Sequence, residues 1–328
     1  MAGVELKIVE NDEAAMRLDR WFKVHYPGLG FGALQKLLRS GQVRVDGGRV
    51  KSDTRLVVGQ TVRVPPLAVD QAPAKGGPLT GKTIRGQEDG DVLRQMLLYE
   101  DEKVLVFNKP SGLAVQGGSG VVRNVDEMLE AWRNKKGEKP RLVHRIDRDT
   151  SGCLVVARTR GAAQFLTKMF RDRETGKTYW ALVKGAPPRR EGKLSSWLVK
   201  EQTPDGDRMR VAKHGEEGAD HAITEYRIVE TAGQKLTWLE LTPHTGRTHQ
   251  LRVHTLQLGC PIIGDPKYFE SDSNWDFPGG MQNRLHLHAR RIQIPHPSGG
   301  MIDVTAPLPP HMVQSWNLLG FEESSATE

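Results

Sequence analysis

The sequence has few cysteines and no long apolar run. Its 328 residues include only two cysteines, Cys153 and Cys260, too few for a disulfide framework or a four-cysteine zinc site. No stretch approaches the roughly 20 apolar residues that cross a membrane. The first fifteen residues carry four acidic side chains, unlike a secretory or organellar presequence. We therefore expect a cytoplasmic protein without a membrane anchor.

Basic residues exceed acidic ones, and the excess is concentrated near the N-terminus. The chain has 47 Lys and Arg against 40 Asp and Glu, a formal charge of +7. Between Arg17 and Pro66 there are ten basic and three acidic residues, so this segment alone has an excess of seven. A concentrated basic segment suits a phosphate-binding surface, although a solvated charged face explains the same pattern.

The first 66 residues have the pattern of a small helix-helix-hairpin module. Apolar residues recur at helical spacing in residues 16–26 and 31–40, and residues 42–50 and 60–64 alternate as strands. An Asp-Gly turn follows the first of these strands. Five basic side chains of this module are candidates for RNA contact: Arg20, Lys36, Arg39, Arg44 and Arg49.

Residues 67–90 lack hydrophobic periodicity and are rich in Pro, Gly, Gln and Lys, which predicts a linker. Within them, residues 76–83 (GGPLTGKT) have the spelling of a phosphate-binding loop. That motif acts only between a buried strand and a helix, and neither pattern flanks it here. A nucleotide-dependent RNA enzyme is therefore an alternative that an ATP-binding assay with Lys82→Ala would test.

Residues 91–322 have the mixed pattern of a larger α+β domain, and residues 323–328 that of a frayed tail. Apolar spacing predicts helices over residues 125–135 and 161–173. Residues 200–220 are polar and rich in glycine, which predicts a mobile excursion between strands.

A crowded polar turn at residues 144–152 precedes an apolar run that predicts a buried strand. Asp147 and Asp149 lie among three nearby arginines, so at least one carboxylate should be ionised at neutral pH. An ionised carboxylate suits a nucleophile or base better than an acid. The two carboxylates would face opposite sides of an extended segment, which disfavours the carboxylate pair of a glycosidase.

A second polar cluster contains His244, His249 and His254, which step by five residues. That step does not keep ligands on one helix face as a step of four would, and no cysteine or carboxylate lies nearby at metal spacing. We therefore expect no metal and interpret the histidines as structural or RNA-facing. A serine hydrolase based on Ser119 or Ser151 lacks the strand-nucleophile-helix context.

Four motifs in order resemble those of the RluA-type pseudouridine synthases of ribosomal and transfer RNA. They are HRIDRDTSG at residues 144–152, KTY at 177–179, GRTHQLRVH at 246–254 and GDPKY at 264–268. The likeness covers most of residues 97–310. Two further segments, NKPSG at residues 108–112 and NRLHLHA at 283–289, are most similar to the branch of large-subunit synthase C.

The resemblance implies an α+β fold with two parts. Residues 15–66 resemble the alpha-L RNA-binding domain that several of these enzymes carry, and we expect this domain over residues 1–66. Residues 91–322 would form the catalytic domain, a mixed and mainly antiparallel β-sheet with flanking helices. Gln116 stands where histidine is common in the family, and the motif at residues 264–268 is nearer to other branches, so the substrate is less defined than the reaction.

The resemblance also implies roles for individual residues. Asp147 would be the catalytic aspartate and Arg252 its ion-pair partner, which orients the carboxylate and stabilises the anion. Tyr179 would pack on the flipped uracil, although that tyrosine alone would suggest a core residue. Arg145 would enter the RNA stack and offset the few kcal/mol that base extrusion costs. Arg247 and His249 are further candidates for RNA contact.

The implied function is isomerisation of specific uridines to pseudouridine in RNA, with 23S large-subunit ribosomal RNA as the expected substrate. No cofactor, metal or obligatory protein partner is implied, and we expect a monomer. The motifs leave open whether Asp147 attacks the base, attacks the sugar or removes a ribose proton. The alternative from another class is a non-catalytic RNA-binding protein of ribosome assembly on the same scaffold.

Overall fold

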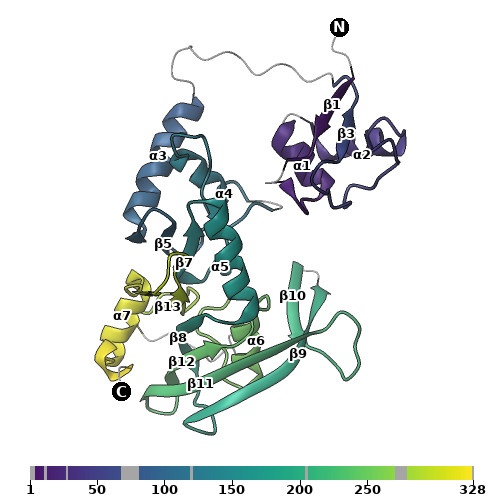
Figure 1. Cartoon of the computed structure of the whole chain (residues 1–328). Helices are drawn as coiled ribbons and strands as arrows, with labels where there is room; N and C mark the ends of the chain where they lie inside the picture. Colours follow the sequence, from purple (N-terminus) through teal and green to yellow (C-terminus); the bar gives the residue numbers. More distant parts are fainter. Residues whose placement is uncertain are drawn as a thin grey trace. The chain divides into compact units, whose positions relative to one another are not determined.

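A computed structural model of the chain describes residues 4–10, 13–26, 29–67, 81–118, 121–203, 206–269 and 279–326. It divides the chain into two compact units, Met1–Pro78 and Leu79–Glu328 (Figure 1). Among the described residues, no helix has the length and apolar character needed to cross a bilayer.

The N-terminal unit is a small α+β module. Its elements are β1 (Glu5–Ile8), α1 (Leu18–His25), α2 (Phe31–Arg39), β2 (Arg44–Val45) and β3 (Thr61–Val64). The strands form an antiparallel sheet in the order β1-β3-β2. Leu18, Trp21 and Phe22 lie at i, i+3 and i+4 on α1 and are buried in the core of this unit, as amphipathic spacing requires. The two predicted helices are confirmed.

The larger unit contains both strands and helices. Its elements are α3 (Gly81–Gln95), β4 (Leu97–Glu100), β5 (Val104–Lys109), α4 (Val125–Met128), η2 (Leu129–Trp132), β6 (Arg141–Leu142), β7 (Ser151–Ala157), α5 (Arg160–Asp172), β8 (Gly176–Lys184), β9 (Glu191–Thr203), β10 (Gly206–Val211), β11 (Asp220–Ala232), β12 (Leu236–Pro243), α6 (Gln250–Gln257), β13 (Leu287–Pro295), β14 (Met301–Thr305), α7 (Pro310–Leu319) and η3 (Glu323–Ala326).

One mixed sheet organises this unit. In the described residues it has eleven strands along the order β10-β9-β11-β12-β8-β13-β7-β5-β4, with β14 beside β13 and β6 beside β7. Every neighbouring pair is antiparallel except β13 and β7, where His288 pairs with Ser151 and Ala289 with Gly152. The predicted α+β class with a mainly antiparallel sheet is confirmed.

Helices cover both faces of the sheet at β5 and β7 (Figure 1). Successive side chains of a strand point to opposite faces. Val104 and Val155 accordingly pack against α5, and Phe107 and Leu154 pack with the cluster that includes residues of α3 and α4. Burial on both faces explains why residues 151–157 are apolar without alternation.

The predicted linker was wrong over residues 81–90, which belong to helix α3. The helix begins in a polar segment without periodicity, and its buried contacts lie toward its C-terminal end, at Leu93. Two contacts fix its middle: Arg123 pairs with Asp89, and the indole of Trp132 donates to the Gly90 carbonyl at 3.2 Å. Tertiary contacts rather than local pattern therefore stabilise α3. Residues 76–80 of the phosphate-loop spelling lie outside the described residues.

The irregular excursion predicted at residues 200–220 is not found over residues 200–203 and 206–211, where β9 and β10 form an antiparallel hairpin. Ion pairs explain its polar sequence: Arg208 and Arg210 both contact Glu201, and Arg210 also pairs with Glu216.

Two smaller differences concern element ends. The predicted helix at residues 125–135 ends at Trp132, because the Asn134 side chain accepts from the backbone N–H groups of Lys136 and Glu138 in a turn. Residues 323–326 of the predicted frayed tail form the short 3-10 helix η3, and Glu323 pairs with Arg290 at 2.7 Å.

Candidate active site

The polar turn of residues 143–150 is held at fixed points of the core. Val143 packs in the cluster beneath α5, and Ile146 packs in the cluster that includes Leu93. Lys109, fully buried at the end of β5, donates to the carbonyls of Pro110, Leu113 and Arg148 at 2.8–2.9 Å. Burial lowers the pKa of Lys109 to about 7, although the negative charges of the carboxylates at positions 149 and 147 act to raise it. The turn is therefore rigid at its backbone.

Glycine is required where the turn enters β7. Gly152 has φ +106°, and a β-carbon there would overlap the backbone carbonyl of Ala289 on β13. This close approach coincides with the parallel pairing of β7 and β13. Across β13, Ala289 pairs with Tyr179 of β8. The turn and Tyr179 are thus separated by about two strand spacings, roughly 10 Å.

Polar residues at the two ends of the turn stabilise it internally. The His144 ring stacks on Phe170 with centroids 4.3 Å apart, and its Nε2 accepts from the Val155 N–H at 2.8 Å. Burial lowers the pKa of His144 to about 3, so the ring is neutral. The Ser151 hydroxyl lies 2.8 Å from Nδ1 of His288, whose Nε2 lies 3.2 Å from the Ala306 carbonyl. Ser151 and His288 are both buried, so a substrate cannot reach either side chain.

Asp147 stands between these anchored ends and faces the start of α6. Its side chain is 25% exposed, and its Oδ2 lies 3.3 Å from Nη1 of Arg252, which is 3% exposed. Nε2 of His249 lies 4.0 Å from the same oxygen. The fold therefore brings together the polar clusters at residues 144–152 and 242–254. Asp147 is more exposed than His249 or Arg252, so it can reach a substrate.

Asp265 holds Arg252 in place through a bidentate ion pair. Its Oδ2 and Oδ1 accept from Nε and Nη2 of Arg252, both at 2.7 Å, and Oδ1 also accepts from the backbone N–H groups of Lys267 and Tyr268. Burial opposes the charge of Arg252, but hydrogen bonds and charge from Asp265, with the further charge of Asp147, raise its pKa. The guanidinium is a fixed cation with one N–H aimed at Asp147.

Tyr268 completes this group. Its ring lies 5.0 Å from the guanidinium carbon of Arg252, and its hydroxyl lies 2.9 Å from Nδ1 of His249. His249 has φ +52° and precedes α6, so a left-handed turn directs its ring toward Tyr268 and Asp147. Burial, with the nearby charge of Arg252, lowers the pKa of His249 despite the opposing charge of Asp147. The imidazole is therefore neutral at pH 7.

Tyr179 is half-buried on β8. Burial and the nearby charge of Asp147 raise the pKa of its phenol, so the hydroxyl stays protonated at neutral pH. Its ring can therefore offer a neutral face to a ligand beside Asp147.

The predicted RNA-contacting residues differ in their surroundings. Arg145 is exposed, and its Nη1 lies 3.4 Å from the Gln116 side chain. Arg247 donates to the His221 carbonyl at 3.1 Å and lies 3.4 Å from Asp220, so its guanidinium is partly engaged.

In the N-terminal unit, one of the five predicted basic side chains, Arg44, is partly buried and makes two hydrogen bonds to the backbone. The Arg44 guanidinium donates to the carbonyls of Gly41 and Gly47. The others are exposed on the surface of the unit: Arg20, Lys36, Arg39 and Arg49.

Other histidines also contact residues of the protein, and His244 of the second polar cluster lies 3.1 Å from the Glu225 carboxylate. His254 lies between the hydroxyls of Thr224 and Ser196, at 2.8 and 3.0 Å. His286 lies 2.8 Å from the Ser315 hydroxyl. In the part of the chain that the structure describes, no three His, Cys, Asp or Glu side chains are grouped to hold a metal ion.

Comparison with known proteins identifies relatives of the whole chain. A family model described as RNA pseudouridylate synthase matches residues 103–257. Ribosomal large subunit pseudouridine synthase C of Haemophilus ducreyi is 37% identical over 312 residues, which cover 95% of this chain and 94% of that protein. The chain belongs to the RluA-type pseudouridine synthase family.

Two further relatives of this pseudouridine synthase agree. RNA pseudouridine synthase 4, mitochondrial, of Arabidopsis thaliana is 38% identical over 375 residues, covering 92% of this chain and 78% of that protein. The solved structure of human RNA pseudouridylate synthase domain containing 4 has a TM-score of 0.59 and 29% identity, covering 73% of this chain and 98% of that chain. The protein is an isomerase that converts uridine to pseudouridine in RNA. The non-catalytic alternative has no support.

Sequence reasoning missed three residues of the pseudouridine synthase site. Asp265 and Tyr268 lie in the GDPKY motif, which resembled the family without suggesting what its acid and tyrosine contact. Lys109 lies in the NKPSG segment, where a lysine before proline gives no sign of complete burial. A signal was present for Asp265, because a buried arginine needs an anionic partner.

Proposed function

We propose that this pseudouridine synthase modifies large-subunit ribosomal RNA and that Asp147 is its catalytic group. The observation that carries the proposal is the chain of contacts from Asp147 to Arg252 to Asp265, in which two buried residues fix one partly exposed carboxylate. An ionised carboxylate with a fixed orientation suits nucleophilic attack or proton abstraction during cleavage of the bond between uracil and ribose. Relatives named ribosomal large subunit pseudouridine synthase C support the class of RNA.

Base flipping gives roles to two further side chains, Tyr179 and Arg145. An enzyme that acts on a base must take it out of the stack, at a cost of a few kcal/mol. The protonated Tyr179 ring would pack on the extruded uracil. The exposed Arg145 guanidinium would fill the gap that the uracil leaves in the RNA.

The N-terminal unit would bind RNA as an alpha-L domain. Four of the five predicted cations are exposed there, and its folded core holds them on one small module. Arg247 and His249 would contact RNA near the active site. We further propose that the enzyme acts as a monomer in the cytoplasm, where the two free, buried cysteines would stay reduced. Light scattering tests the oligomeric state.

Asp147→Asn tests the catalytic assignment. It keeps the size of the side chain and removes its charge, so we expect no tritium release from uridine-labelled large-subunit RNA transcripts and nearly unchanged RNA affinity. Asp172→Asn, on the surface at the end of α5, is the matched control and should keep full activity. Turnover by the Asp147→Asn protein would overturn the assignment.

The substrate assignment needs a separate measurement. Pseudouridine mapping in the RNA of a strain that lacks this protein would identify the modified uridines. We expect pseudouridine to disappear from large-subunit ribosomal RNA, and a change confined to transfer RNA would contradict the proposed substrate.

A further inference from the structure

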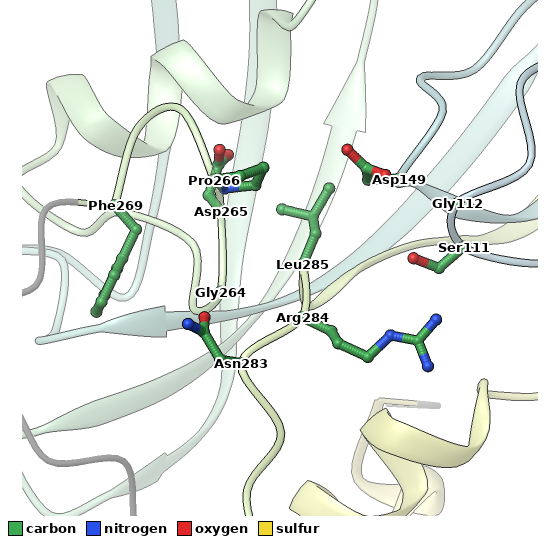
Figure 2. A pocket seen from close by; sticks show the side chains of 10 residues that line it. All are labelled: Ser111, Gly112, Asp149, Gly264, Asp265, Pro266, Phe269, Asn283, Arg284 and Leu285. Atoms are coloured by element: carbon green, nitrogen blue, oxygen red, sulfur yellow. The ribbon is translucent and has the colours of Figure 1, made fainter. Parts of the chain in front are cut away.

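A polar pocket lies beside the candidate active site. Its volume of about 390 Å³ is within the range of about 300–1,000 Å³ that is usual for ligand sites. Its walls come from segments far apart in the sequence, at residues 111–112, 149, 264–266, 269 and 283–285 (Figure 2). Asp149 belongs to the same turn as Asp147, and Asp265 holds Arg252. The pocket and the candidate active site therefore share structural elements.

The pocket wall carries the carboxylates of Asp149 and Asp265 and the guanidinium of Arg284, and Asp265 is already paired with Arg252, which is not a lining residue. In Figure 2, Asp149, Ser111 and Arg284 are grouped at one end, and Asn283 and Phe269 lie at the other. Within the described residues, neither the Asp149 carboxylate nor the Arg284 guanidinium has a hydrogen-bond or ion-pair partner. A carboxylate beside the cation disfavours a phosphate group. A neutral ligand that presents both N–H donors and oxygen or nitrogen acceptors would satisfy both side chains.

We propose that this pocket binds an unpaired base next to the target uridine and prefers guanine, an inference that rests on the proposed function. Guanine alone among the four RNA bases presents two adjacent N–H donors, N1–H and N2–H, which match the two oxygens of Asp149. Its O6 and N7 acceptors, on the neighbouring edge, match the forked donors of Arg284. Single-stranded RNA is read through such base edges.

The position of the pocket suits the nucleotide beside the flipped uridine. Residues 147 and 149 are separated by two peptide units, which span at most about 7 Å. The Leu285 side chain and Pro266 add apolar surface for the face of a base (Figure 2). The pocket is thus a specificity site for the known reaction, and its occupant would determine which uridines are accepted.

The test measures RNA affinity without turnover. Full-length protein carrying Asp147→Asn is titrated with RNA hairpins that contain one loop uridine, flanked on either side by each of the four bases in turn. We expect guanine at one flanking position to bind about tenfold more tightly, or better, than the other three bases. Equal affinity across the set would overturn the proposal.

Variants assign the preference to the pocket. Added to Asp147→Asn, Asp149→Asn and Arg284→Ala should each reduce the preference for guanine to less than twofold, and Arg284→Lys should do the same because it keeps the charge but removes the fork. Arg171→Ala, an exposed cation of α5, should leave the preference intact. A preference that survives both Asp149→Asn and Arg284→Ala would overturn the assignment.

A phosphate contact gives a different result. If Arg284 met a phosphate, Arg284→Ala would lower the salt slope of binding by about one and weaken all hairpins equally, and that outcome would also overturn the proposal. The hairpins contain no ribosomal sequence. An absence of pseudouridine from large-subunit transcripts would therefore contradict the proposed substrate without changing the guanine preference.

Discussion

Replacing Asp265 by asparagine should damage both stability and catalysis, although Asp265 does not contact Asp147. The variant keeps the side-chain volume but leaves the buried Arg252 cation without its bidentate partner. Breaking a buried ion pair from one side costs about 3–5 kcal/mol. The asparagine oxygen can still accept from the backbone N–H groups of Lys267 and Tyr268, so we expect a destabilisation near the lower limit, about 3 kcal/mol.

This destabilisation should produce a measurable fall in the melting temperature, Tm. The larger unit, Leu79–Glu328, has about 250 residues, for which 1 kcal/mol lowers Tm by about 2–4 °C. We therefore expect Tm to fall by roughly 6–12 °C in a thermal unfolding assay. Arg252 would also lose its fixed direction toward Asp147, and a misplacement of about 1 Å can cost about 100-fold in rate. Tritium release should then show kcat lowered more than KM is raised.

The exposed pair between Arg291 and Asp303 provides the matched control. Its side chains are 46% and 40% exposed, and such surface pairs contribute about 0–1 kcal/mol. Asp303→Asn should therefore change Tm by only a few degrees and leave kcat unchanged. If Asp265→Asn has no larger effect on Tm than Asp303→Asn and keeps full kcat, the reasoning from burial is refuted. A double-mutant cycle with Arg252→Met would then measure the coupling energy of the pair directly.

Buried and surface charges lead to three further predictions. Burial lowers the pKa of His144 to about 3 and of His254 to about 4, below the unfolded value of about 6.5, so the unfolded chain binds more protons between these values. In urea denaturation, the free energy of unfolding should keep its full value above pH 6.5 and fall as the pH is lowered toward 4, by up to about 1.4 kcal/mol per pH unit for each histidine. His254→Gln should reduce this dependence on pH, and an unchanged slope of the free energy against pH would contradict the prediction. Lys109→Met removes the donor to three backbone carbonyls and should lower the free energy of unfolding by about 3 kcal/mol in urea, and a change below 1 kcal/mol would show that the turn does not depend on it. Replacing the exposed Arg20 and Lys36 together by alanine in the full chain should reduce the salt slope of RNA binding by about 0.7–0.9 for each phosphate that is no longer neutralised, whereas an unchanged slope would show that these side chains do not contact RNA.

The buried ion pair of Arg252 and Asp265 explains why the sequence predicted some site residues and missed others. Asp147 and Arg252 belong to motifs that resemble a known family, so both could be named before their contact was seen. The second partner of Arg252, Asp265, was not named, because 13 residues and a loop separate the two and a sequence pattern carries no distances. Lys109 was missed because its partners are three backbone carbonyls, which have no side-chain signature.

Hydrophobic periodicity likewise explains which helices and strands the sequence predicted and which it missed. The helices over residues 16–26 and 31–40 were predicted well because each carries its own apolar stripe. Helix α3 and strand β10 were missed because their sequences are polar. Contacts of Leu93 and Gly90 stabilise α3, and a backbone ladder with ion pairs stabilises the hairpin of β9 and β10.

The sequence by itself determined the fold class, the family and the polar turn that holds Asp147, because local spacing and motif order are properties of a linear chain. Only the tertiary structure decided which groups meet. The parallel pairing of β13 with β7, which Gly152 permits, brings Tyr179 of β8 near the turn. The start of α6 places Arg252 between Asp147 and Asp265. Long-range packing sets these distances and leaves the Asp147 carboxylate partly exposed beside two buried residues.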